Sequence, residues 1–126
     1  MILLDFANDI IGTGTVRTLP QFARVLVAFG SAHAGTVYRS RAIIRRDRHL
    51  VVVAWPHPQR LSDDPAGALS LPDFADALIG SGDYVSSDSD VRVAFTGPAM
   101  YPVRTISRHH EHVIIVSSRY PVPGVQ

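Results

Sequence analysis

Two stretches of the chain, Ile43–Val53 and Ile106–Val116, can be aligned with each other residue for residue. Each begins with residues typical of a strand, passes through a short polar segment, and returns in an apolar run rich in valine or isoleucine. Two β-rich runs joined by a polar tip form the sequence pattern of a β-hairpin. Because the chain carries this pattern twice, we expect a mainly antiparallel sheet or a small barrel.

A second repeat lies upstream of each hairpin. Thr18–Leu26 reads TLPQFARVL, and Ser70–Leu78 reads SLPDFADAL. Both start with a hydroxyl residue suited to an N-cap, place proline in the first turn, and continue with apolar residues at helical spacing. Gly30 follows the first stretch, and Gly80 and Gly82 follow the second, as helix-ending residues. The spacing predicts two short amphipathic helices.

These patterns together predict one α+β domain over residues 1–126, because a chain of this length has room for one hydrophobic core. Helix plus hairpin would then occur twice, in related units spanning 18–55 and 70–118. The end of the chain, 120–126, is too rich in proline for a helix and predicts an extended arm. The apolar runs are far shorter than the roughly 18 residues of a membrane span, and the N-terminus does not fit a signal peptide.

The residue types exclude several kinds of chemistry. The sequence contains no cysteine and no lysine, which excludes disulfides, thiol catalysis, P-loops and Schiff bases. Gly12–Arg17 lacks the third glycine of a dinucleotide fingerprint. Asp83, Asp88 and Asp90 lack the glycine and glutamate of a calcium loop. We therefore expect a protein that is not an enzyme and that uses no cofactor.

A histidine cluster occupies the tip of the second hairpin, in the stretch RHHEHV. His110 and His112 are two residues apart, so in a strand they would share a face and could hold a divalent metal. A lone His-x-His is a weak signal, however, and a solvated tip explains the cluster without a metal. We favour His109, His110 and His112 as tip residues that face solvent or a partner. His112 aligns with His49, which predicts a structural role for that pair.

Charge is strongly segregated along the chain, although the net charge is only +1. Residues 17–60 carry eight arginines and one aspartate, and residues 61–90 carry seven aspartates and no arginine. Two such blocks either neutralise each other inside the fold or meet complementary blocks on neighbouring subunits.

The basic block contains a possible contact surface. Strand alternation would place Arg39, Arg41 and Arg45 on one face of the first hairpin, with Arg46 and Arg48 at its tip. Such an arginine stripe could bind an acidic protein surface or a nucleic-acid backbone. We favour the protein partner, because a pI near 8.3 is low for a dedicated nucleic-acid-binding protein.

The C-terminal third also resembles a known family. Its pattern consists of Gly82–Val85, Asp90–Gly97, Tyr101–Ile106 and His112–Val116. It is similar to small bacteriophage head-to-tail connector and stopper proteins, in which a strand leads through a glycine turn into a Tyr-x-Val-x-x-Ile strand and a final hairpin of a small β-barrel. The resemblance implies a virion subunit, made in the host cytoplasm, that assembles with itself, in a ring for instance, and with other structural proteins.

We therefore expect a structural protein of the phage neck, tail or capsid surface, with Tyr120 of the arm as a further interface residue. Two alternatives belong to other classes. One is a small cytoplasmic inhibitor or immunity protein that binds a single partner. The other is a nucleic-acid-binding module that uses the Arg39–Arg48 hairpin.

Overall fold

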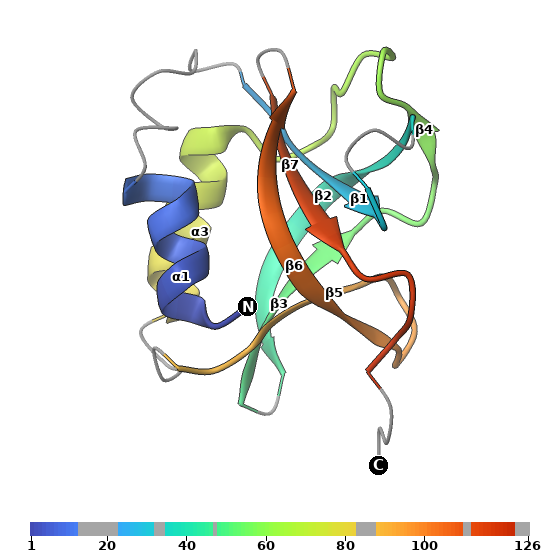
Figure 1. Ribbon diagram of the computed structural model, residues 1–126. Helices are drawn as coiled ribbons and strands as arrows, with labels where there is room; N and C mark the ends of the chain where they lie inside the picture. Colours follow the sequence, from blue (N-terminus) through green and yellow to red (C-terminus); the bar gives the residue numbers. More distant parts are fainter. Residues whose placement is uncertain (13–22, 32–34, 47, 83–87, 110–111, 123–126) are drawn as a thin grey trace.

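The computed structural model describes residues 1–12, 23–31, 35–46, 48–82, 88–109 and 112–122 (Figure 1). The helical elements are α1 (Leu3–Ala7), the π-helix η1 (Asn8–Gly12) that continues it, and α3 (Leu71–Gly82). The strands are β1 (Val25–Phe29), β2 (Thr36–Arg46), β3 (His49–Ala54), β4 (Gln59–Arg60), β5 (Val91–Ala94), β6 (Met100–His109) and β7 (His112–Ser117). The α+β class expected from the sequence is confirmed.

The strands form one sheet in the order β1-β7-β6-β5-β3-β2-β4, and β1 also pairs with β2. All strands except β4 therefore close a ring. Neighbours are antiparallel except for the parallel pairs β1–β7 and β3–β5, so the sheet is mainly antiparallel, as expected. The ring is not a regular barrel, because β2 and β6 each shift register and change partners part-way along, between Ser40 and Ala42 and between Val103 and Thr105.

These two bulges belong to an internal twofold repeat of three strands. β1, β2 and β3 correspond to β5, β6 and β7, and each set is an antiparallel meander. Ile43 lies opposite Val52 in the first hairpin, just as Ile106 lies opposite Ile115 in the second. The hairpin alignment proposed from the sequence is therefore matched by the observed strand registers.

The helices follow the same repeat. Leu3–Gly12 reads LLDFANDIIG, and Leu71–Gly80 reads LPDFADALIG. Two backbone hydrogen bonds at the start of α1 have equivalents at the start of α3. Leu3 N donates to Ser89 O (2.7 Å), as Leu71 N donates to Ala23 O (2.8 Å). Val91 N donates to Met1 O (2.9 Å), as Val25 N donates to Leu69 O (3.0 Å). Equivalent hydrogen bonds at equivalent positions show that the two halves follow the same backbone path.

The first helix predicted from the sequence is wrong over its second half. Residues 25–29 form strand β1, and residues 18–22 lie outside the described residues. Val25–Phe29 is a continuous apolar run, and helical spacing cannot distinguish such a run from a strand buried on both faces. Gly30, with a φ of +84°, follows this strand and does not end a helix. The helical counterpart of α3 is therefore α1, which precedes residue 18.

The second predicted helix is confirmed as α3. The hydroxyl of Ser70 accepts a hydrogen bond from Asp73 N (3.2 Å), as an N-cap residue should. The helix continues through Gly80 and ends at Gly82. None of the helices in the described part of the chain is long and apolar enough to cross a membrane.

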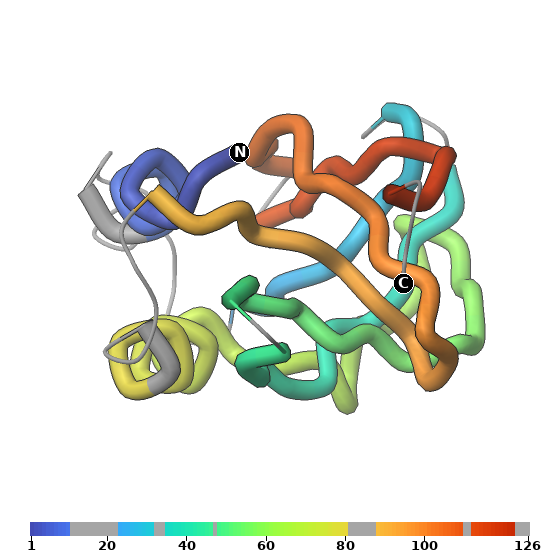
Figure 2. Tube along the Cα trace, turned by 90° about the horizontal axis from the view of Figure 1, so that it is seen from below, coloured from blue at the N-terminus to red at the C-terminus, as the bar shows by residue number. Residues whose placement is uncertain are grey.

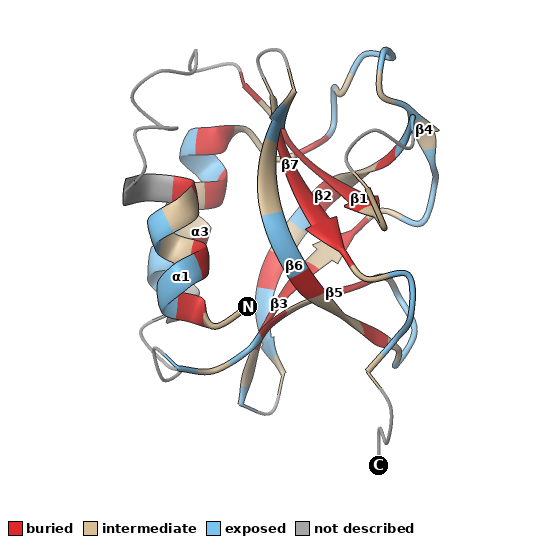
Figure 3. Ribbon diagram, viewed as in Figure 1, coloured by how far each residue is buried: buried red, intermediate tan, exposed pale blue. Residues whose placement is uncertain are grey.

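The core lies between the helices and the inner side of the ring. α1 and α3 lie side by side at one end of the strands (Figure 2), with the rings of Phe6 and Phe74 6.2 Å apart. Buried positions follow β1 and β7 (Figure 3). The main core cluster includes Phe6, Ile10, Val25, Val27, Ile43, Leu50, Val52, Leu71, Phe74, Leu78, Val91, Val93, Val113 and Ile115. A second cluster, on the other side of the strands, consists of Leu26, Ala28, Val37, Ala68, Ile114 and Val116.

Candidate functional site

The predicted arginine stripe does not lie on one face of β2. Val37 packs in the second cluster, whereas Ile43 packs in the main core cluster, because the bulge shifts the alternation by one residue. Arg39 therefore shares a face with Val37, and Arg45 shares the opposite face with Ile43. The prediction of a continuous stripe is wrong, because the sequence pattern assumed uninterrupted strand alternation.

Two of these arginines make contacts within the chain. Arg39 Nη1 donates to the carbonyl of Ala66 (3.0 Å), and its buried Nε has no hydrogen-bond partner in the described part of the chain. The guanidinium carbon of Arg41 lies 4.5 Å from the centre of the Trp55 ring, which is the geometry of a cation–π contact. Arg46 and Arg48 lie at the end of the β2–β3 hairpin, and we call this pair the arginine tip. Arg45 and Arg48 are exposed and Arg46 is half-buried.

The histidine cluster lies at the equivalent tip of the second hairpin. His109 and His112 form the last residue pair of β6 and β7 before the turn, and His110 lies outside the described residues. The backbone N–H of Arg24 donates to His112 Nδ1 (3.1 Å), so His112 has the structural role predicted for it. The equivalent nitrogen of His49 is buried and has no hydrogen-bond partner among the described residues. Among the described residues, no group of three histidine, aspartate or glutamate side chains could hold a metal ion.

Acidic side chains lie on other parts of the surface. Asp63 Oδ2 accepts a hydrogen bond from Arg60 N (3.1 Å), and Asp64 Oδ1 accepts one from Ala66 N (3.0 Å), so both aspartates stabilise the same loop. Asp73 and Asp76 are exposed on α3, and we call this pair the acidic helix face. Within the described part of the chain, none of these four aspartates forms an ion pair with an arginine. The predicted interface residue Tyr120 is 77% exposed and follows β7.

A pocket is lined by residues that belong neither to the arginine tip nor to the histidine cluster. It has a volume of about 300 Å³ and is lined by Phe29, Thr36, Tyr38, Phe95, Tyr101 and Arg119. The start of β1 is hydrogen-bonded to Leu69, two residues before α3, and the start of β5 to Met1, two residues before α1. Phe29 and Phe95 come at the other ends of β1 and β5. The helices therefore cover one end of the core and the pocket opens at the opposite end.

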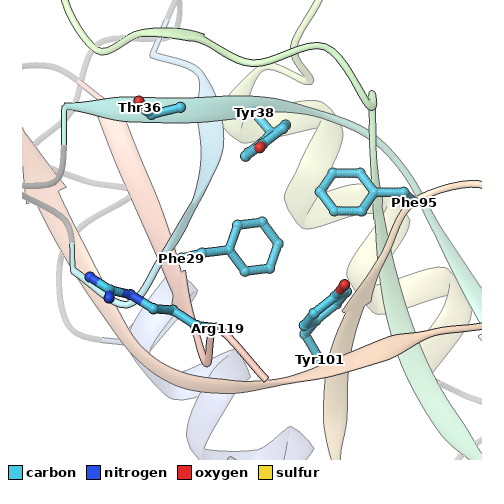
Figure 4. Close-up of a pocket in the computed structure, with 6 residues that line it drawn as sticks. All are labelled: Phe29, Thr36, Tyr38, Phe95, Tyr101 and Arg119. Atoms are coloured by element: carbon cyan, nitrogen blue, oxygen red, sulfur yellow. The ribbon is translucent and has the colours of Figure 1, made fainter. Parts of the chain in front are cut away.

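Aromatic rings from both halves form the walls of this pocket (Figure 4). Phe29 and Phe95 are equivalent positions of the repeat, and so are Tyr38 and Tyr101. The equivalent contacts Tyr38–Phe95 and Phe29–Tyr101 have nearly the same ring-centre distance, 5.0 and 5.1 Å. The two phenylalanine rings, one from each half, lie 5.6 Å apart. The aromatic pocket therefore lies where the two halves of the ring meet.

Sequence reasoning missed the aromatic pocket, although one signal was present. Val25–Phe29 reads VLVAF and Val91–Phe95 reads VRVAF, so an alignment of these two segments pairs the two phenylalanines.

Comparisons of the chain with protein-family models, curated proteins and solved structures found no match. Chemically, the pocket offers apolar ring faces, tyrosine and threonine hydroxyls, and one guanidinium group.

Proposed function

We propose that the protein is a non-enzymatic structural subunit of a bacteriophage particle, in the neck, the tail or the capsid surface, which acts by assembling with further copies and with other structural proteins. The observation that carries this proposal is the separation of exposed charges of opposite sign. The arginine tip is at the end of the β2–β3 hairpin, and the acidic helix face is on α3 (Figure 1).

Surfaces of opposite charge that do not meet within one chain are suited to meet between two chains. Contact of the arginine tip of one copy with the acidic helix face of the next would be a head-to-tail contact. Repeated head-to-tail contacts generate a closed ring when the rotation between copies permits it. Complementary charges of this kind mainly fix the orientation and speed of association. The resemblance of the C-terminal third to connector proteins supports the same role, and this part of the sequence includes β5, β6 and β7.

Charge reversal tests this contact in both directions. A tip variant, Arg46→Glu with Arg48→Glu, and a helix variant, Asp73→Arg with Asp76→Arg, should each reduce self-association of the full chain. Mixing the two variants should restore it, because the acidic tip of one can then contact the basic helix of the other. Light scattering over a concentration series at low and high salt measures the assembly, and electron microscopy of the same samples shows whether rings form.

Arg104→Glu is the matched control, since Arg104 is an exposed arginine at the bulge of β6 and belongs to neither surface. It should leave association unchanged. A wild-type chain that remains monomeric at low salt and high concentration would overturn the proposal and favour the inhibitor alternative. Association that survives both reversals, together with loss of duplex DNA binding in the tip variant alone, would instead favour the nucleic-acid alternative.

A further inference from the structure

We propose that the aromatic pocket is a binding site for a small aromatic carboxylate. The ring of the ligand would lie against the cluster formed by Phe29, Tyr38, Phe95 and Tyr101, and its carboxylate would pair with Arg119. This site is separate from the arginine tip and the acidic helix face, so it goes beyond the assembly role.

The walls favour a flat ring. Three of the four side chains, Phe29, Tyr38 and Phe95, are half-buried and pack on the main core cluster, which holds them in place from behind. Their rings meet at steep angles, 84° for Phe29 with Tyr38 and 62° for Tyr38 with Phe95. Ring faces and edges thus both border the open pocket, and aromatic ligands bind well to such a mixture. A volume of about 300 Å³ is at the lower end of ligand pockets and suits one or two rings.

Arg119 favours a negatively charged ligand. Its side chain lies over Gly30, where a Cβ atom would come within 3.1 Å of Arg119 Cγ and Cζ and closer still to Nε. Gly30 also has a φ of +84°, which a side chain would disfavour. Within the described part of the chain, Arg119 forms no ion pair with a carboxylate. Arg119 is an exposed residue that lines the pocket, and a guanidinium can bind a carboxylate through two parallel hydrogen bonds.

The polar groups also define one orientation for the ligand. The aromatic lining residues come from both halves, but Thr36 and Arg119 have no polar counterparts. The equivalent residues in the other halves are Ala99 and Pro56. The single cation is therefore on one side of a nearly symmetric set of rings. Tyr38 and Tyr101 both line the pocket, and each carries a phenolic hydroxyl. They are thus placed to bond to polar substituents on the ligand.

Four small probes separate the contributions of ring and charge. Phenylacetate has both the ring and the carboxylate, benzyl alcohol has the ring without charge, benzylamine has the ring with a positive charge, and acetate has no ring. Titration of the full-length protein with each probe, followed by NMR of the tyrosine and phenylalanine ring signals, measures the affinities. Phenylacetate should bind with a Kd about tenfold to hundredfold lower than that of benzyl alcohol, as expected for a charge-assisted contact, and benzylamine and acetate should not bind.

Arg119→Gln should remove this advantage of phenylacetate while leaving benzyl alcohol binding and self-association unchanged. Arg104→Gln is the control for loss of an exposed arginine outside the pocket. No binding of phenylacetate to the wild-type chain, equal binding to Arg119→Gln, or tighter binding of benzylamine would each overturn the proposal. These outcomes are independent of whether the protein assembles, since assembly is measured separately by light scattering.

Discussion

The two halves of the ring share a backbone path but place their buried hydroxyl groups on different strands. In the first half Ser40 of β2 lies opposite Ala54 of β3, whereas in the second half Val103 of β6 lies opposite Ser117 of β7. Ser40 Oγ donates to the Val25 carbonyl (2.6 Å), and Ser117 Oγ donates to the Pro102 carbonyl (3.1 Å). The two halves therefore share the same strand registers, whereas the hydrogen bonds of their buried side chains differ.

The same difference appears at the hairpin tips and at the bulges. His112 accepts a backbone hydrogen bond and His49 does not. Arg41 stacks on Trp55, whereas the residue equivalent to Trp55 in the second half is Ser118. Equivalent positions in the two halves can therefore serve as controls for each other, because the same substitution can be made at both positions on a similar backbone.

The largest effect should come from the helices. Phe6 and Phe74 are fully buried and in contact with each other. Phe6→Ala and Phe74→Ala should each lower the free energy of unfolding by about 3–5 kcal/mol, because each leaves a cavity in the core. Urea denaturation measures both values. A much smaller loss of unfolding free energy for Phe6→Ala than for Phe74→Ala would show that α1 contributes less to the core than α3.

The buried serines should give a smaller and unequal effect. Ser40 Oγ also accepts a hydrogen bond from Leu69 N (3.2 Å), so it joins β1 to the segment before α3. Ser40→Val introduces the residue of the other half and should destabilise the fold by about 1–3 kcal/mol, since it removes a buried donor and acceptor. Ser117→Ala, the reciprocal change, should destabilise by about 0.5–1.5 kcal/mol. Thermal and urea unfolding that reversed this order would contradict the assigned contacts.

The histidines should respond in opposite directions. His112→Leu leaves the N–H of Arg24 without its acceptor and should lower the free energy of unfolding by about 1 kcal/mol. His112→Asn, which keeps an acceptor at a similar position, should recover part of that loss. His49→Leu removes a buried nitrogen that has no partner among the described residues, so it should be neutral or stabilising. Equal destabilisation by both leucine variants would exclude a specific role for the His112 hydrogen bond.

The smallest effect should occur at the bulges. Arg41→Ala should destabilise the protein by about 0.5–1 kcal/mol through loss of its contact with Trp55, and it should also change the fluorescence of this single tryptophan. Arg104 lies at the equivalent bulge and has no tryptophan opposite it. Arg104→Ala should therefore change neither the stability nor the tryptophan fluorescence. Identical behaviour of the two variants would indicate that the stacking contributes nothing.

The sequence predicted those features that depend on neighbouring residues. The hairpin tips and α3 followed from strand alternation, from a capping serine and from helical spacing. The helix proposed over 18–29 was wrong because a strand buried on both faces has no polar face to reveal its period. The arginine stripe was wrong because a bulge inverts the alternation of side chains between the two faces of β2. No residue near Arg41 in the sequence indicates that bulge. The aromatic pocket was missed because Phe29, Phe95 and Arg119 meet only through the closed ring.

The parallel pairing of β1 with β7 has a consequence for how the protein is made. Val25 lies beside Val113, so one of the first strands to be synthesised can pair fully only after one of the last. Contacts between such distant segments make folding slow. Until β7 emerges, the apolar edge of β1 stays open to other chains, as edge strands are when uncovered. Aggregation during synthesis should therefore depend on how soon the final hairpin appears.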